Sequence, residues 1–201
     1  TKMRFCRGQY MSFIKTSHRI VIMLLLLVMI ACASFEKTKQ TTDTPIGVNT
    51  EIQHRFERAL NHQKQGEYDQ AKVIYQSIVS QEPLYISPVL NLGIIAINQA
   101  RFDEAKNFFE AVIESDKTHP VALNYLGFIA REAGDFDLSE TYYRQIIVVD
   151  PNDLNAIRNL GILLDLYRGR LEDALALYEQ YQGLLAEPDP TIKDWIFDTK
   201  N

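Results

Sequence analysis

The sequence predicts an all-α solenoid of about four helical hairpins, closed at its C-terminal end by one short helix. The main observation is that apolar, aromatic and small residues recur every 34 residues between position 51 and about position 187. A hydrophobic content of 46% and a charged content of 23% are typical of a folded protein. One hairpin of this length cannot bury its apolar face alone, so the repeat predicts stacking of neighbours.

Four kinds of position carry the 34-residue period. They are the pairs Leu92-Gly93, Leu126-Gly127 and Leu160-Gly161, the aromatics Tyr68, Phe102 and Phe136, the small residues Ala71, Ala105 and Ser139, and the aromatics Tyr75, Phe109 and Tyr143. Glycine and alanine allow helices to approach closely, and the aromatic rings are expected to fill the space between hairpins. This pattern resembles the tetratricopeptide repeat, which implies a helix A and a helix B in each repeat.

On this resemblance, the repeat domain is expected over residues 50–188, with repeats at 52–85, 86–119, 120–153 and 154–188. Arg58-Ala59 replaces Leu-Gly in the first repeat, which a repeat at the end of the stack is expected to tolerate. The fourth repeat carries one extra residue, because eight positions separate Gly161 from Gly169 and seven separate Gly127 from Gly134.

Helix starts are marked by residues that cap helices. Thr50 with Gln53 matches a capping box, and Asp153 is placed to cap the helix that begins at Leu154. Asp189 followed by Pro190 predicts a capping helix and tail over 189–201. Its apolar stripe includes Trp195, which either covers the last helix B or anchors a partner.

The first 31 residues predict a signal peptide. Basic residues precede an uncharged apolar run of twelve residues at 20–31, too short to span a membrane comfortably. Met11 gives a more compact basic region than position 1 and is the expected start. Residues 28–32, Val-Met-Ile-Ala-Cys, resemble the lipobox of bacterial lipoproteins, which implies a lipid on Cys32. The alternatives are an uncleaved anchor or an ordinary signal peptide.

The location of the mature protein follows from the same resemblance. Residues 33–49 lack a helical period and are expected to be a flexible tether. No Asp follows Cys32, because Ala33 stands there, so the outer membrane is favoured over the inner membrane. We therefore expect a membrane-anchored protein that faces the periplasm.

Composition and motifs argue against an enzyme. The sequence contains no His-x-x-x-His, Gly-x-Ser-x-Gly or phosphate-loop motif, and His54 and His62 are too far apart to share a metal. Residues 32–201 carry a net charge of about -10, so nucleic acid is not an expected partner. We expect no metal, no cofactor and no small-molecule substrate.

Binding is expected on the helix A faces, which line a concave groove in proteins that this sequence resembles. Asparagine amides in the groove could hold the main chain of a peptide, apolar side chains could form pockets, and arginines could take a carboxylate. The groove residues are Leu90, Asn91, Ile94, Asn124, Phe128, Arg131, Asn155, Arg158 and Asn159.

The expected partner is a protein or peptide segment of an envelope complex. Residues 159–167, 174–181 and 194–196 resemble the tetratricopeptide-repeat proteins assigned to TonB, ExbB and ExbD systems, which implies an accessory role there. The alternatives are a type IV pilus-assembly lipoprotein, which has more repeats, and a regulator or adaptor of peptidoglycan enzymes.

Overall fold

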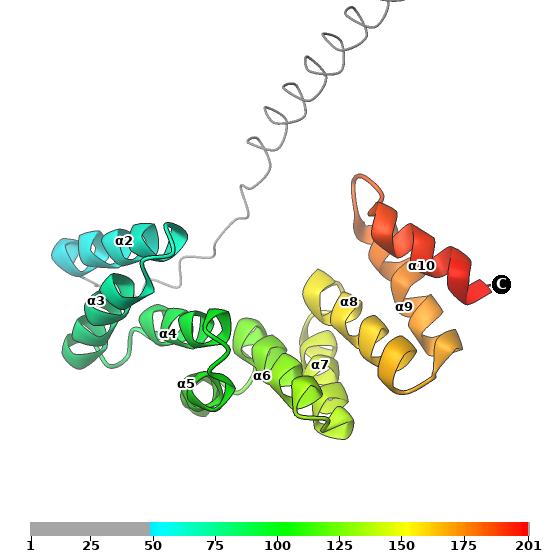
Figure 1. Cartoon of the computed structure of the whole chain (residues 1–201), viewed down its shortest axis with the longest axis horizontal. Helices are drawn as coiled ribbons and strands as arrows, with labels where there is room; N and C mark the ends of the chain where they lie inside the picture. The colour runs from blue at the N-terminus through cyan, green and yellow to red at the C-terminus, as the bar shows by residue number, and fades with distance from the viewer. Residues whose placement is uncertain (1–48, 201) are drawn as a thin grey trace, which may run out of the picture. The chain divides into compact units, whose positions relative to one another are not determined.

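The computed structural model describes residues 49–200, which belong to one compact unit, Asp43–Asn201. Every regular element in this part of the chain is a helix (Figure 1), as the sequence predicts. The signal segment, Cys32 and residues 33–48 of the predicted tether lie outside the described residues.

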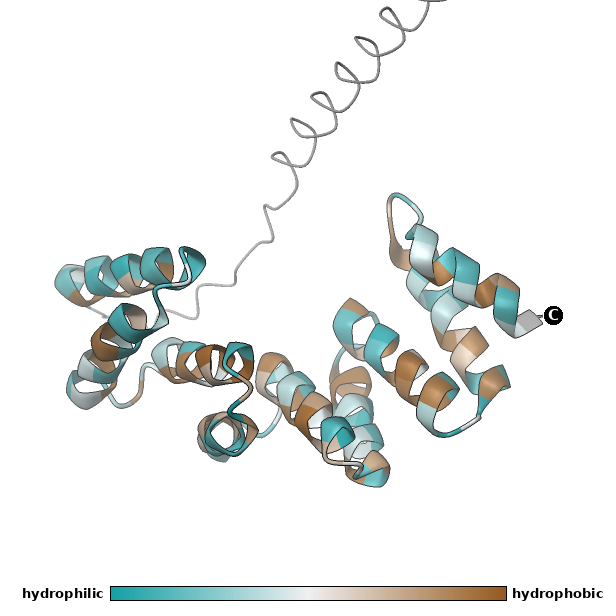
Figure 2. Ribbon diagram, viewed as in Figure 1, coloured by the Kyte–Doolittle hydropathy of each residue, from teal (hydrophilic) through white to brown (hydrophobic). Residues whose placement is uncertain are grey.

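The helices form antiparallel hairpins, and each hairpin packs on the next. The hairpins are α2 (Thr50–Lys64) with α3 (Tyr68–Gln81), α4 (Ile86–Asn98) with α5 (Phe102–Ser115), α6 (Pro120–Glu132) with α7 (Phe136–Val149), and α8 (Leu154–Ile162) continued by the π-helix η2 (Leu163–Tyr167) with α9 (Leu171–Leu184). A last helix, α10 (Pro190–Lys200), packs on α9. Figure 2 shows that α4, inside the stack, is strongly hydrophobic, whereas α2, at its end, is largely hydrophilic.

Helices A and B touch where a glycine meets an aromatic ring. A Cβ on Gly127 would lie 2.6 Å from the Tyr143 ring, and one on Gly93 would lie 2.7 Å from Phe109. Gly161 meets Tyr178 in the same way, at 2.7 Å. The predicted close approach is therefore confirmed, and it lies within the second, third and fourth hairpins.

The aromatic rings also pack between hairpins. Phe109 of α5 is fully buried and stacks on Tyr125 of α6, with ring centroids 4.8 Å apart and planes 4° from parallel. In the first hairpin, Phe56 of α2 lies 5.3 Å from Tyr85, which precedes α4. These contacts join the first hairpin to the second and the second hairpin to the third.

The first hairpin is packed more tightly than the sequence suggests. Ala59 stands in the slot that glycine fills elsewhere, and its side chain is fully buried in a cluster with Phe56, Tyr75 and Ile78. Ala59 is therefore enclosed by its own hairpin even though that hairpin lies at the end of the stack.

The extra residue of the fourth repeat is absorbed in η2. Between the two helices of the second and third hairpins, one residue has a positive φ, Ala100 and Gly134 respectively. The residue after it donates its backbone N–H to the carbonyl five positions back, as Asp135 does to Ala130 at 2.8 Å. In the fourth hairpin Arg170 N donates to Leu164 O, six positions back, also at 2.8 Å. One added residue converts the last turn of helix A into a π-turn, which is how single insertions are accommodated in α-helices.

Two of the three predicted helix caps are as expected. Asp153 Oδ1 accepts the N–H of Ala156 at 2.8 Å, and Asp189 Oδ1 accepts the N–H of Thr191 at 2.9 Å. The prediction for α2 is wrong by one residue, because Asn49 is the N-cap and its Oδ1 accepts the N–H of Glu51 at 3.0 Å. Asparagine is among the strongest N-cap residues, so the helix starts one residue earlier.

Candidate protein-binding surfaces

The predicted groove residues lie on three first helices, α4, α6 and α8, and we call this set the helix-A strip. Two of its members face inward. Leu90 is 8% exposed and Asn91 is 9% exposed, and Asn91 Nδ2 donates to the carbonyl of Ser87 at 2.8 Å. Asn91 thus serves its own helix, and the exposed part of the strip begins with half-buried Ile94.

Two asparagines join the strip across hairpins. Asn159 Nδ2 of α8 donates to Asn124 Oδ1 of α6 at 2.8 Å, and both side chains are half-buried. This bond uses one donor and one acceptor. A primary amide offers two donors and a carbonyl oxygen, so the pair keeps groups that can bond to a peptide main chain.

The two arginines of the strip differ in their surroundings. The guanidinium of Arg131 lies 5.2 Å from the Phe128 ring centre and 5.7 Å from that of Tyr167, and Arg131 pairs with Glu132 at 3.2 Å. Its side chain is only 14% exposed, so it links α6 to η2. Arg158 is exposed and forms no ion pair within residues 49–200, which leaves it available for an acidic group.

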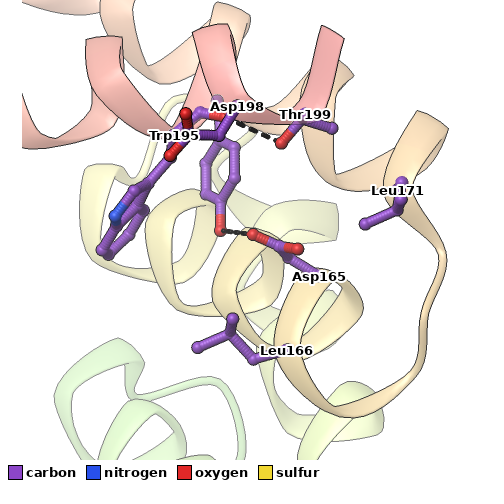
Figure 3. A pocket seen from close by; sticks show the side chains of 7 residues that line it. Asp165, Leu166, Leu171, Trp195, Asp198 and Thr199 are labelled. Carbon is purple, nitrogen blue, oxygen red and sulfur yellow. Dashed lines mark hydrogen bonds between the residues drawn. The ribbon is translucent and has the colours of Figure 1, made fainter. Parts of the chain in front are cut away.

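A second surface lies where η2, α9 and α10 meet (Figure 3). A pocket of about 330 Å³ is lined by Asp165, Leu166, Leu171, Tyr178, Trp195, Asp198 and Thr199. The Tyr178 hydroxyl donates to Asp165 Oδ2 at 3.2 Å, and burial, with the neighbouring carboxylate, raises the pKa of Tyr178 well above its usual value. Trp195 packs 5.6 Å from the Tyr178 ring, so it helps to cover α9 and also lines this pocket.

Sequence reasoning identified Trp195 but missed the pocket. The signal that could have found it is the extra residue between Gly161 and Gly169, which places Asp165 and Leu166 in a π-turn that the other hairpins lack. π-turns occur often at functional sites.

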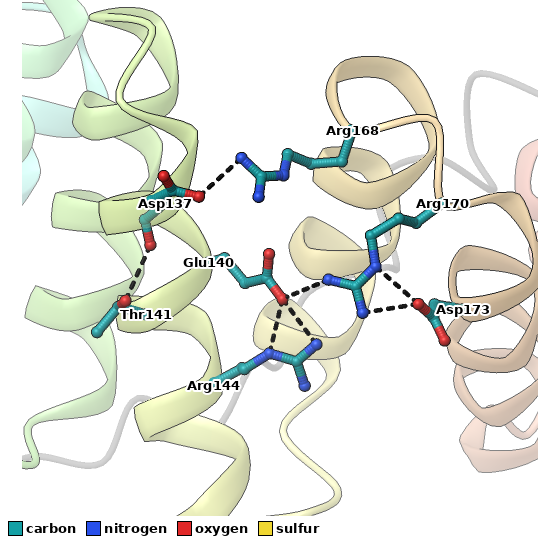
Figure 4. Close-up of polar contacts among 7 residues, drawn as sticks. All are labelled: Asp137, Glu140, Thr141, Arg144, Arg168, Arg170 and Asp173. Carbon is teal, nitrogen blue, oxygen red and sulfur yellow. Dashed lines mark hydrogen bonds and ion pairs between the residues drawn. The ribbon is translucent and has the colours of Figure 1, made fainter.

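Ion pairs connect the third and fourth hairpins beside this surface (Figure 4). Glu140 of α7 accepts hydrogen bonds from Arg144 and from Arg170 at 2.9 Å each, and Arg170 also pairs with Asp173 at 2.7 Å. Burial alone would raise the pKa of Glu140, but the hydrogen bonds and charges of the two arginines outweigh it and hold the pKa below its usual value. Arg168 pairs with Asp137 at 2.7 Å.

Two negative findings apply to residues 49–200. These residues contain no group of three or more His, Cys, Asp and Glu side chains placed to hold a metal ion. Among the helices described, none is long and apolar enough to cross a membrane.

A stack of helical hairpins with exposed amide, apolar and arginine side chains along its first helices defines a helical-repeat scaffold. Two family profiles described as "Tetratricopeptide repeat" match residues 62–126 and 127–190, together more than half of the chain. The chain belongs to the tetratricopeptide-repeat family. Domains of this family are typically scaffolds that bind protein partners.

Solved structures with the same fold include several of MamA. MamA from Desulfovibrio magneticus RS-1, from residue 41 to its end, has a TM-score of 0.65 and 16% identity, covering 77% of this chain and 86% of that chain. A MamA AMB-1 structure has a TM-score of 0.58 and 19% identity, covering 74% of this chain and 80% of that one. At these identities the likeness shows the fold alone. No curated protein matches the sequence.

Proposed function

We propose that the chain is a non-catalytic protein-binding scaffold of the bacterial cell envelope, anchored to a membrane by a lipid on Cys32. The observation that supports binding is the exposed part of the helix-A strip. It combines the linked amides of Asn124 and Asn159 with the guanidinium of Arg158, which forms no ion pair among residues 49–200, on neighbouring first helices.

This surface suits an extended or helical segment of another protein. The amide groups left by the Asn124–Asn159 bond can bond to a main chain, and half-buried Ile94 and Phe128 offer apolar contacts. Arg158 would take an acidic group of the ligand, because a guanidinium forms two parallel bonds to a carboxylate.

The envelope assignment is supported by the lipobox resemblance at residues 28–32. Within the envelope, the resemblance of the closing segment favours an accessory role in a TonB-type system, with the outer membrane as the location. A type IV pilus-assembly lipoprotein is a weaker proposal, because four hairpins are described here and those proteins stack more. A regulator of peptidoglycan enzymes is the other alternative.

Binding through the strip can be tested by recovering cross-linked partners from envelopes. Asn124→Ala with Arg158→Glu should abolish recovery of the wild-type partners and leave the helical circular-dichroism signal intact. Asn107→Ala with Lys117→Glu makes the same kinds of change at exposed positions away from the strip and should change nothing. Wild-type recovery by the folded strip variant would show that the strip is not the binding surface.

The anchor can be tested by palmitate labelling in bacteria. Cys32→Ser should remove the label and release the protein from the membrane fraction, because an acyl chain contributes about 0.8 kcal/mol per buried methylene to anchoring. Labelling that persists in Cys32→Ser would show that the lipid is elsewhere.

A further inference from the structure

The pocket between η2, α9 and α10 lies in the fourth hairpin, where the π-turn interrupts the regular repeat. It depends on the π-turn, which places Asp165 on its lining and leaves Leu166 67% exposed. Leu171, at the start of α9, is 48% exposed and also lines the pocket. Large apolar side chains are thus left partly in solvent around a concave site.

Two kinds of group in the pocket lining, an aromatic ring and carboxylates, together favour a cation. The indole of Trp195 offers an aromatic face, and the carboxylates of Asp165 and Asp198 offer negative charge (Figure 3). Aromatic faces attract ammonium and guanidinium groups, and a nearby carboxylate strengthens the attraction. An anion or a purely apolar ligand would leave these carboxylates without a cationic partner.

The two carboxylates of the pocket form no ion pair among the described residues, and the nearest cation is Arg158, whose charge acts on the neighbouring Tyr178 hydroxyl. Arg168 and Arg170 join η2 to α9, but they pair with Asp137, Glu140 and Asp173 (Figure 4). Asp165 accepts a hydrogen bond only from the neutral hydroxyl of Tyr178, and Asp198 forms no ion pair within the described part of the chain. Residues 163–200 contain eight acidic and four basic side chains, so the surrounding charge is also negative.

We propose that this pocket binds a lysine or arginine side chain of a protein partner, with the cationic group between Asp165, Asp198 and the indole of Trp195. Leu166 and Leu171 contact the aliphatic stem of that side chain or an apolar residue beside it. The inference rests on the proposed function that the chain binds proteins, and it adds a second contact distinct from the helix-A strip. A volume of about 330 Å³ suits one or two side chains rather than a folded element.

The site can be tested with the full chain in detergent, because Trp195 is the only tryptophan and its fluorescence reports on the pocket. The probes are acetyl-Leu-Lys-Leu-amide and acetyl-Leu-Arg-Leu-amide, with Gln and Glu versions for comparison, and calorimetry provides a second readout. We expect saturable binding of the basic peptides, weakened by salt, and at least tenfold weaker binding of the Gln and Glu peptides.

Variants separate the pocket from the rest of the molecule. Asp165→Asn keeps an acceptor for Tyr178 and removes the charge, and we expect it and Asp198→Asn each to weaken the basic peptides at least tenfold. Asp194→Asn, an exposed change on the same helix outside the pocket lining, should have less than a twofold effect. Thermal melts confirm that each variant is folded.

Three results would overturn the inference: no saturable binding of either basic peptide, equal binding of the Gln peptide, or unchanged binding in both pocket variants. The strip change Asn124→Ala alone leaves Arg158 and the pocket in place and should bind these peptides normally. If the peptides fail while the strip still governs partner recovery, the pocket inference fails and the scaffold function stands. If no partner is recovered at all, the proposed function itself fails.

Discussion

The contact between Gly127 and Tyr143 predicts a large effect from a single methyl group. In Gly127→Ala the new Cβ would lie 2.6, 2.8 and 2.9 Å from three atoms of the Tyr143 ring. This ring is fully buried, so it cannot move aside into solvent. Overpacking of a buried site costs roughly 1–3 kcal/mol, whereas replacing glycine by alanine inside a helix contributes about 1 kcal/mol of stability.

Because three ring atoms lie under 3.0 Å from the new Cβ, we take the upper part of the overpacking range, about 2–3 kcal/mol, so Gly127→Ala should lose about 1–2 kcal/mol net. This loss lowers the thermal midpoint by about 2–8 °C for a domain of this size. Gly127→Leu should lose more. Gly183→Ala is the control, because Gly183 lies in α9 with nothing within 4 Å of its ideal Cβ, and it should gain up to about 1 kcal/mol. Melts followed by circular dichroism measure both. If Gly127→Ala melts at or above the wild-type temperature, the close-packing explanation of the repeat glycines is wrong.

Ala100→Gly should raise stability by about 1 kcal/mol, because Ala100 has a φ of 55° at a turn position where the other hairpins have glycine. Gly134→Ala should lower stability for the same reason, and urea titrations measure both changes. Tyr178→Phe should lower the thermal midpoint, because it loses the hydrogen bond from the Tyr178 hydroxyl to Asp165. The pKa of Glu140 is lowered in the folded protein, so its contribution to stability is present above pH 4.5 and is lost as the pH falls through the folded pKa. In thermal melts at a series of pH values, Glu140→Gln should show a smaller fall in midpoint over this range than the wild type.

The stacking of the hairpins could be predicted from sequence because close packing leaves a periodic mark. Gly93, Gly127 and Gly161 each face an aromatic ring, and only the smallest residue fits at that distance. The same argument could not predict that Ala59 is fully buried, because its burial depends on how the two helices of the end hairpin pack around it.

The candidate site was less accessible to sequence reasoning. Asn91 and Asn124 are neighbouring groove positions of one residue type, yet Asn91 bonds within α4 and Asn124 bonds across to α8. Whether the side chain bonds within its own helix or across to the next hairpin depends on its position around the helix axis, to within one residue. A 34-residue period does not define that position closely enough. The guanidinium of Arg131 lies over the rings of Phe128 and Tyr167, because the π-turn brings Tyr167 close to α6. The sequence shows that the fourth repeat has one extra residue, but it does not show at which turn of the helix that residue is accommodated.

The central claim is that partners bind along the first helices of the stack. The most direct measurement is photo-cross-linking in cells that express the full chain with benzoylphenylalanine at one exposed position. Asn155 on α8 lies in the strip, and Val148 on α7, 81% exposed, lies outside it. We expect a specific cross-linked partner from position 155 and none from position 148. A partner captured from position 148 but not from position 155 would contradict the claim and place recognition on the second helices.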